Sequence, residues 1–452
     1  MKRKLTAKET VFVASMLFGM LFGAGNLIFP VSMGQMAGSQ VWKAAAGFLV
    51  TAVGIPLLGV IALGVSRKEG LLELSSMVGR KYGIFFTCAL YLTIGPFFAI
   101  PRCATVSFTV GGRAFIPAEN ETVALGIFSL LFFALVLYFS LRPGQILTWV
   151  GKVLNPLFLC FLGLLLIRAL LSPMGAAANA EPVGAYAEIP LFQGFLEGYN
   201  TMDVLAGLAF GIIVVNVIRS LGVTEPAAVA ANTIKSGFFS CLLMGGIYVL
   251  VAVVGAQSRS AFEASANGGE GLADIAGYYF GKAGTWILAV TVTLACLKTA
   301  VGLITSCGET FEKMFSKGPS YKIWTIIFCS ASFLIANLGL NKIIAFSVPV
   351  LMFLYPLAVT LILLAVIGKT FSYDRKVFVS VTVLTLLAAV VDFLHALPKE
   401  TIKALHLSEV IRKAQSLLPL SDIGFGWLLP ALVGLVIGLA WRMAGERGKT
   451  QE

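Results

Sequence analysis

Long apolar runs with almost no charge follow one another along the chain. Residues 44–66, 236–258 and 343–368 contain no Asp, Glu, Lys or Arg, and each reaches the ~20 residues that a helix needs to cross a bilayer core. These runs predict an all-α polytopic membrane protein. We expect about twelve membrane-spanning segments, at 10–33, 43–66, 82–111, 122–141, 150–171, 189–219, 234–256, 283–309, 323–340, 343–368, 377–394 and 425–442.

Two of these segments, the first and the sixth, are interrupted near their centres. Residues 22–30 read FGAGNLIFP, and glycine and proline weaken a helix where unpaired backbone amides are already costly. The sixth segment contains GYNTMD at 198–203, and an aspartate there would be expensive if it faced lipid. We expect Asn200 or Thr201 to cap a new helix whose first turn holds Asp203.

Interrupted segments five helices apart indicate inverted repeats with a binding site at the membrane midplane. The first repeat, helices one to five, is expected at 1–171 and an external linker at 172–188. The second repeat, helices six to ten, is expected at 189–368, and helices eleven and twelve with a cytoplasmic tail at 369–452. In the external loop 257–282 we expect a short helix over the outer vestibule.

The two breaks offer complementary backbone groups. Unwinding at 23–25 frees N–H groups beside the positive end of a half-helix, and these suit a carboxylate. Unwinding at 199–201 exposes carbonyl groups, which suit an ammonium group or Na⁺. Because the remaining walls are expected to be apolar, the site fits an apolar zwitterion. The candidate substrate-binding residues are Gly23, Ala24, Gly25, Asn26, Tyr199, Asn200, Thr201 and Met202.

Composition and charge agree with a membrane location. The 452 residues are 58% hydrophobic and 12% charged, whereas a soluble domain would carry about 25% charged residues. The net charge of +11 follows topology rather than nucleic-acid binding. With the N-terminus inside, cytoplasmic segments hold roughly twice as many Lys and Arg as external ones, as the positive-inside rule predicts. We therefore expect a multi-pass protein in contact with lipid, with both termini cytoplasmic.

Catalysis and metal binding have little support in the sequence. The seven cysteines lie within apolar runs, and the two histidines, His395 and His406, lie near the last loop. This distribution predicts neither a disulfide framework nor a metal site. Because no metalloprotease, P-loop or dinucleotide motif is present, we expect no enzyme activity, no cofactor and no obligate protein partner.

An ion or solute channel is the alternative function, since broken helices also build selectivity filters. Those filters usually come as repeated loops in an oligomer, whereas GAGN and GYNTMD are unlike breaks in one long chain. The two breaks therefore favour a carrier. A carrier for another small apolar amino acid is the second alternative.

Seven motifs carry a family resemblance: LFGAGNLIFP (21–30), GPFFAIPRCATVSF (95–108), GYNTMD (198–203), GVTEP (222–226), ACLKTAVGLITSCGETF (295–311), NLGL (337–340) and SVPVLMFLYP (347–356). Over about residues 6–442 the chain resembles the bacterial branched-chain amino acid:cation symporters. The resemblance implies import of leucine, isoleucine and valine through the bacterial inner membrane, coupled to Na⁺ in most members. It also implies the five-plus-five inverted repeat of the leucine-transporter fold, within the amino acid–polyamine–cation superfamily.

The resemblance further implies a sodium site between helices one and eight. Carried over to this chain, its ligands are the carbonyl groups of Gly19, Phe22 and Ala295 and the side chains at positions 298 and 299. Thr299 fits this pattern. Lys298 departs from it, because a hydroxyl is expected at that position.

Lys298 admits three interpretations, since a lysine near the middle of a membrane helix must be paired, hydrated or neutral. Its ammonium group replaces Na⁺, with proton exchange or without ion coupling. Alternatively, it pairs with a carboxylate such as Asp203 or with a carbonyl group at a helix end. In the third interpretation it extends to the cytoplasmic interface.

Arg102 is a second charged residue inside a membrane segment, together with Asp203. We expect Arg102 near the substrate pathway, or gating against a carboxylate such as Glu197, or else in an ion pair that holds the third helix. Candidate side chains for contact with an aliphatic substrate are Met202 and Phe210 and, more weakly, Phe97 and Phe98.

Overall fold

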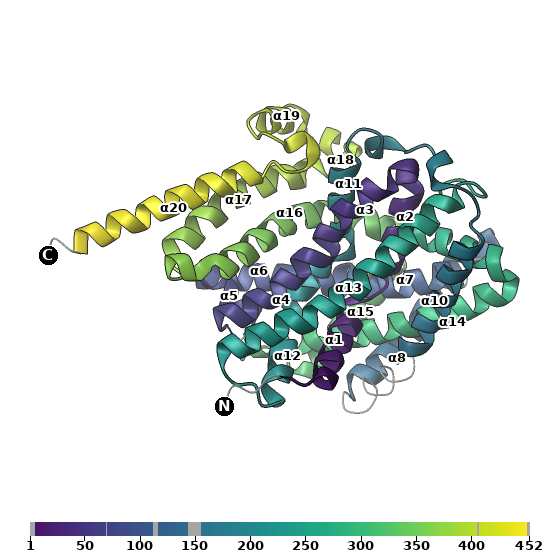
Figure 1. Cartoon of the computed structure of the whole chain (residues 1–452), viewed down its shortest axis with the longest axis horizontal. Helices are drawn as coiled ribbons and strands as arrows, with labels where there is room; N and C mark the ends of the chain where they lie inside the picture. Colours follow the sequence, from purple (N-terminus) through teal and green to yellow (C-terminus); the bar gives the residue numbers. More distant parts are fainter. Residues whose placement is uncertain (1–4, 69, 112–115, 143–154, 405, 450–452) are drawn as a thin grey trace.

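The computed structural model describes residues 5–68, 70–111, 116–142, 155–404 and 406–449. Within these ranges the chain is a bundle of helices without strands, and most helices run along a common diagonal direction (Figure 1). Figure 1 also shows the C-terminal helix α20 projecting beyond the main body. The predicted all-α class is confirmed.

Each expected segment has a helical counterpart in the described chain. The continuous ones are α8 (Glu121–Ser140), α10 (Asn155–Leu171), α13 (Pro226–Ser258), α15 (Tyr321–Ala336), α16 (Leu340–Ile367), α17 (Arg375–His395) and α20 (Leu428–Lys449). The divided or kinked ones are α1 (Ala7–Leu21) with α2 (Gly25–Ala37), α3 (Val41–Leu49) with α4 (Ile55–Ser66), α6 (Arg80–Leu92) with α7 (Ala99–Gly111), α11 (Pro190–Glu197) with α12 (Asp203–Ser220), and α14 (Gly268–Met314).

Three short helices lie in the connections, namely α5 (Leu71–Ser75), α18 (Lys399–Ala404) and α19 (Ser408–Ser416). The first residues of the fifth expected segment, 150–154, lie outside the described residues.

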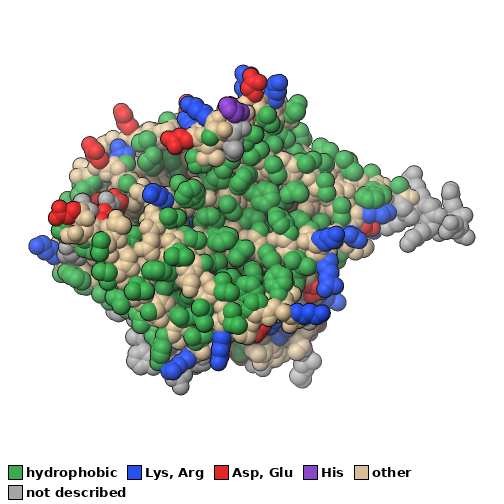
Figure 2. Space-filling view, turned by 180° about the vertical axis from the view of Figure 1, so that it is seen from behind, with side chains coloured by type: hydrophobic (Ala, Val, Ile, Leu, Met, Phe, Trp, Pro, Cys, Tyr) green, Lys and Arg blue, Asp and Glu red, His purple; other side chains and the backbone are tan. Residues whose placement is uncertain are grey.

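The outer surface of the bundle suits a hydrocarbon environment. By length and composition, eight stretches of the described chain are apolar enough to cross a membrane, and shorter apolar helices accompany them. Many large apolar side chains point outward, such as Leu131, which is 62% exposed, and Leu242, which is 65% exposed. Figure 2 shows hydrophobic side chains across the middle of one face and charged side chains gathered toward its edges. A surface of this kind is stable in lipid but not in water.

The first segment is divided at the predicted place. Helix α1 begins with a capping box, in which the Thr6 hydroxyl accepts from the Glu9 backbone N–H and the Glu9 carboxylate accepts from the Thr6 N–H. It ends at Leu21, and α2 begins at Gly25. Pro30 lies inside α2 rather than in the break, so the interruption comes from the glycine-containing residues alone.

The sixth segment is divided at GYNTMD, also as predicted. Helix α11 ends at Glu197, a single 3₁₀ turn follows, and Met202 adopts a left-handed backbone conformation with φ of 63°. A left-handed conformation is uncommon for a residue with a side chain and cannot continue a right-handed helix. Helix α12 then starts at Asp203, which therefore lies in its first turn.

Helix α14 contains the short helix that the sequence predicts within 257–282. Its first part runs from Gly268 to a kink at Gly281, where φ is +58°. That part packs directly on α2, because a Cβ atom at Gly268 would lie 1.7 Å from the carbonyl oxygen of Ile28. The short helix therefore lies against the second half of the first segment.

Helices α3 and α11 make an unusually close backbone contact. A Cβ atom at Gly47 in α3 would lie 1.9 Å from the Leu191 carbonyl oxygen, and one at Gly194 in α11 would lie 2.0 Å from the Ala44 carbonyl oxygen. Small residues of this kind let membrane helices approach each other. The contact holds α11, and thus the break that follows it, against the second segment.

We predict that Gly194→Val destabilises the folded protein, because the added side chain has to displace the α3 backbone. Overpacking of a well-packed interior costs about 1–3 kcal/mol or more. Thermal unfolding of the detergent-purified protein measures the effect. Gly246→Val in α13 is the matched control, since no atom lies within 4 Å of its Cβ position. Equal unfolding temperatures for the two variants would contradict the prediction.

Candidate functional site

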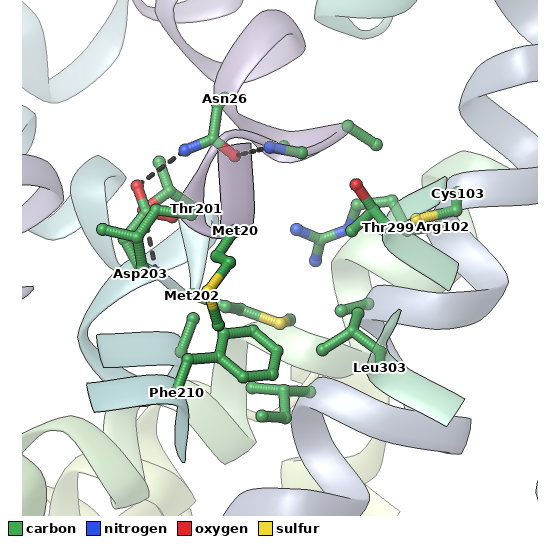
Figure 3. Close-up of a pocket in the computed structure, with 17 residues that line it drawn as sticks. Met20, Asn26, Arg102, Cys103, Thr201, Met202, Asp203, Phe210, Thr299 and Leu303 are labelled. Carbon is green, nitrogen blue, oxygen red and sulfur yellow. Dashed lines mark hydrogen bonds between the residues drawn. The ribbon is translucent and has the colours of Figure 1, made fainter. Parts of the chain in front are cut away.

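A cavity lies where the two interrupted segments meet α7 and α14 (Figure 3). Polar groups from both breaks share its wall with apolar side chains from all of these helices. Its lining residues are Met20, Leu21, Gly23, Ala24, Gly25, Asn26, Ile94, Ala99, Arg102, Cys103, Thr201, Met202, Asp203, Ala206, Phe210, Thr299 and Leu303.

The side chain of Asn26 joins the two breaks. Its Oδ1 accepts a hydrogen bond from the Gly23 backbone N–H at 2.7 Å, and its Nδ2 donates to Asp203 Oδ2 at 2.7 Å. Nδ2 also contacts the hydroxyl of Tyr248 from α13, and that hydroxyl donates to Asp203 Oδ2 at 3.0 Å. Figure 3 shows Asn26 between the first break and Asp203. One amide group thus closes the turn of the first break and fixes the start of α12 beside it.

The first break leaves backbone donors open to the cavity. In the described chain, the N–H groups of Ala24, Gly25 and Asn26 donate to no protein group, whereas Gly23 is occupied by the Asn26 side chain. They form the N-terminal turn of α2, where unpaired donors and the helix dipole favour an anion. The carboxylate site expected at this end stays a prediction.

The carbonyl groups of the second break are more occupied than the sequence suggests. The Gly198 carbonyl accepts from the Thr201 hydroxyl at 2.8 Å, and the Tyr199 carbonyl accepts from the Met202 N–H at 3.0 Å. The Asn200 carbonyl accepts from Arg102 at 2.6 Å. A cation approaching this turn therefore has to share carbonyl groups that the protein already uses.

Most of the predicted substrate-binding residues line the cavity, and two do not. The exceptions are Tyr199 and Asn200. The ring of Tyr199 is buried and stacks on Tyr355 at 4.0 Å, so it packs the core instead of facing the cavity. Phe210 lines the cavity as expected, but Phe97 is 43% exposed and lies outside it, as does Phe98. Aromatic residues in membrane helices usually pack against other helices, and the sequence pattern alone does not show whether a given ring faces a cavity or the core.

Of the residues of the implied sodium site, Thr299 is the one that the cavity lining includes. Thr299 lines the cavity, and its Cγ2 would lie 3.2 Å from a Cβ atom at Gly23. Its hydroxyl donates to the Ala295 carbonyl at 3.1 Å. Gly19 and Phe22 lie at the end of α1 and outside the cavity lining. Thr299 thus packs against the first break, and the sodium site that the resemblance implies stays a prediction.

Lys298 is half-buried and does not line the cavity. Its ammonium group forms no hydrogen bond or ion pair with any residue that the structure describes. The expected pair with Asp203 is absent, because neutral donors from Asn26 and Tyr248 engage that carboxylate. The interpretation in which Lys298 pairs with a carboxylate or a carbonyl group therefore has no supporting contact among the described residues.

Arg102 lies in the cavity wall and bridges three segments. It donates to the Asn200 carbonyl and, at 3.2 Å, to the hydroxyl of Ser347 in α16. Its guanidinium group lies 4.9 Å above the ring of Phe29. It makes no ion pair with Glu197 among the described residues, so the gating pair expected from the sequence is not formed here.

Sequence reasoning missed several lining residues and two hydrogen-bonding ones. Met20 and Ala206 lie within one helical turn of the breaks, so their positions carried a signal. Tyr248 is the only tyrosine in the charge-free run 236–258, and a polar group there needs a partner in lipid. Nothing in the local sequence of Ser347 or Leu303 indicates the site.

The fold is of the leucine-transporter type. Over 96% of this chain and 91% of the other, it resembles the inward-facing conformation of Mhp1, with a TM-score of 0.60 and 13% identity. It also resembles MhsT in complex with L-phenylalanine, over 97% and 98% of the two chains, with a TM-score of 0.57 and 15% identity. At such low identity these likenesses show the fold alone.

The family is shown by sequence. A family model described as branched-chain amino acid transport protein matches residues 6–444, and the chain belongs to this family. It is 53% identical to the branched-chain amino acid permease BrnQ of Lactobacillus delbrueckii subsp. lactis, over 96% of each chain. It is 42% identical to the branched-chain amino acid permease BraB of Bacillus subtilis, over 97% of this chain and 96% of the relative. The family is one of transporters.

We predict that Asn26→Leu, which keeps the size of the side chain, separates the two breaks. The variant leaves the Gly23 N–H and the buried Asp203 carboxylate without their shared partner, and a hydrogen bond to a charged group contributes about 1.5–3 kcal/mol. Thermal unfolding should therefore occur at a lower temperature, and leucine binding should be lost. Asn179→Leu is the control, because Asn179 is exposed. Unchanged stability and binding would show that the junction is unimportant.

Proposed function

We propose that this chain imports leucine, isoleucine and valine across a bacterial cell membrane as a secondary carrier. The observation that carries the proposal is membership of the branched-chain amino acid transport protein family over residues 6–444. Relatives at 53% and 42% identity, over nearly their full length, are named branched-chain amino acid permeases.

The composition of the cavity supports this substrate class. Free N–H groups at the start of α2 suit the carboxylate of an amino acid, and the carboxylate of Asp203 suits its ammonium group. Below Asn26 and the Asp203 carboxylate in Figure 3 lie the apolar side chains of Met20, Met202, Phe210 and Leu303, which line the same cavity. The two methionine side chains are unbranched and flexible and adapt to aliphatic groups of different shape, which fits a carrier that accepts all three amino acids.

The mechanism we propose is alternating access. The first and sixth segments, with the site between them, would move as part of one helix bundle against the rest. The repeats at 1–171 and 189–368 would supply the two related halves, and both termini would lie in the cytoplasm, in keeping with the distribution of Lys and Arg. Asn26 would keep the two broken segments together during the motion, since it contacts both.

We expect labelled leucine uptake into proteoliposomes to saturate and to be competed by isoleucine and valine. Preloading the proteoliposomes with unlabelled leucine should accelerate the entry of labelled leucine, because a carrier changes its orientation more readily with substrate bound than without it. Glutamate and lysine should not compete, since the walls between the polar ends are apolar. Uptake that does not saturate and shows no counterflow would instead support the alternative of a channel. Competition by other apolar amino acids but not by isoleucine would support a carrier of a different substrate.

Coupling to a cation is the second part of the proposal. Thr299 and the Ala295 carbonyl, beside the first break, are suited to Na⁺. Lys298 stands next to them as a cation without a partner in the described chain. We propose that the Lys298 ammonium group takes the place of Na⁺, with the proton as the coupling ion or with no ion coupling.

Uptake under an imposed Na⁺ gradient and then a proton gradient tests this part. We expect the wild-type protein to ignore the Na⁺ gradient and the Lys298→Thr variant to acquire Na⁺ dependence, because a hydroxyl restores a sodium ligand. Lys282→Thr, at an exposed position early in the same helix, is the matched control and should behave as wild type. Saturable Na⁺ activation of the wild type would assign the coupling to Na⁺ and a different role to Lys298.

A further inference from the structure

Arg102 is a buried charge with incomplete partners. Only 2% of the residue is exposed, and it lines the cavity from α7 (Figure 3). Two of its nitrogen atoms donate to neutral oxygen atoms, those of the Asn200 carbonyl and the Ser347 hydroxyl. Its Nε is buried and has no hydrogen-bond partner. A guanidinium group has five N–H donors in a fixed plane, so part of its capacity is unused.

No carboxylate in the described chain lies within ion-pair distance of Arg102. A buried charge without a counter-ion is costly, and within membrane segments such groups are usually paired or serve a substrate pathway. The carboxylate of Asp203 shares the cavity but is engaged by Asn26 and Tyr248. Glu197 acts on Arg102 through its charge but makes no ion pair with it, so a carboxylate from outside the protein can still bind the guanidinium group directly.

The free amide groups of α2 and the guanidinium group approach the same region. Phe29 connects them, because its ring lies 4.9 Å below the Arg102 guanidinium group and 3.4 Å from the Cβ position of Gly25. Gly25 carries one of the N–H groups without a partner in the described chain. A helix N-terminus and a cation that face one cavity from neighbouring walls are complementary to one carboxylate.

We propose that Arg102 is the counter-ion of the substrate carboxylate and completes, with the N–H groups at the start of α2, the site for the acid group of the amino acid. The inference rests on the proposed function, since it names the residue that recognises that substrate. Asp203 then faces the ammonium end. Arg102 contributes a positive charge and a planar pair of donors. When the substrate binds, its carboxylate pairs with this buried charge.

Leucinol tests the assignment, because it keeps the ammonium group and side chain of leucine and lacks the carboxylate. Equilibrium displacement of labelled leucine from purified wild-type protein gives the affinity of each compound. Isothermal titration calorimetry gives the affinities for variants that bind leucine too weakly for the displacement measurement. We expect wild type to prefer leucine by at least ~30-fold, the factor for about 2 kcal/mol at ~1.4 kcal/mol per tenfold.

Arg102→Gln should remove most of that preference, by weakening leucine binding at least ~30-fold while leucinol binding changes little. Arg102→Lys keeps the charge but not the planar fork, so its preference should be intermediate. Asp203→Asn should weaken both compounds and keep their ratio, because both carry the ammonium group. Arg142→Gln is the matched control, since Arg142 also stacks on an aromatic ring, that of Tyr138, but is exposed and outside the cavity.

A purely structural role for Arg102 predicts a different result. Leucine and leucinol would then weaken together in Arg102→Gln, the ratio would stay at its wild-type value, and the assignment would be overturned. If Arg102→Gln does not fold, Arg102→Lys decides alone, and an unchanged ratio in that variant overturns the assignment equally. Failure of wild-type protein to bind or transport leucine would instead refute the proposed function, so the two failures are distinguishable.

Discussion

The hydrogen bonds of Asn26 are the contacts on which the site depends. Two membrane segments that break in the middle expose backbone groups where no water competes, and each such group is expensive. Asn26 satisfies the Gly23 N–H on one side and meets the Asp203 carboxylate on the other. Asn26 and Asp203 are almost fully buried, so little water competes for the hydrogen bond between them. It makes two separate irregularities into one polar centre inside an apolar bundle.

Around this centre the fold distributes charge unevenly. Arg102 and Asp203 face one cavity, each with neutral partners within the described chain, while most other charged residues lie toward the edges of the bundle. Because burial strengthens electrostatic interactions, a zwitterion in the cavity would interact with both strongly. The apolar side chains that line the rest of the cavity contact the aliphatic group of the substrate, so its shape decides which amino acid binds best. Recognition of the amino acid and discrimination among side chains would thus rely on different residues.

Much of the fold was predictable from the sequence because a bilayer imposes simple rules. The length of a span, the cost of a buried charge and the weakness of glycine in a helix are local properties, so the spans and both breaks could be located. The individual contacts were less predictable. Tyr199 lies in a break yet packs on Tyr355, and the carbonyl of Asn200 is occupied by Arg102. Both outcomes depend on helices far away in the sequence.

By itself the sequence determined a multi-span helical bundle and its two interrupted helices, and it predicted an apolar zwitterion as the molecule that the breaks suit. These follow from which residues can exist at the middle of a membrane. Only the tertiary structure decided that Asn26 joins the breaks, that Tyr248 supports Asp203, and that Arg102 makes no ion pair with a described carboxylate. The physical reason is that a hydrogen bond or an ion pair requires two groups within about 3–4 Å, and the packing of distant helices sets that separation.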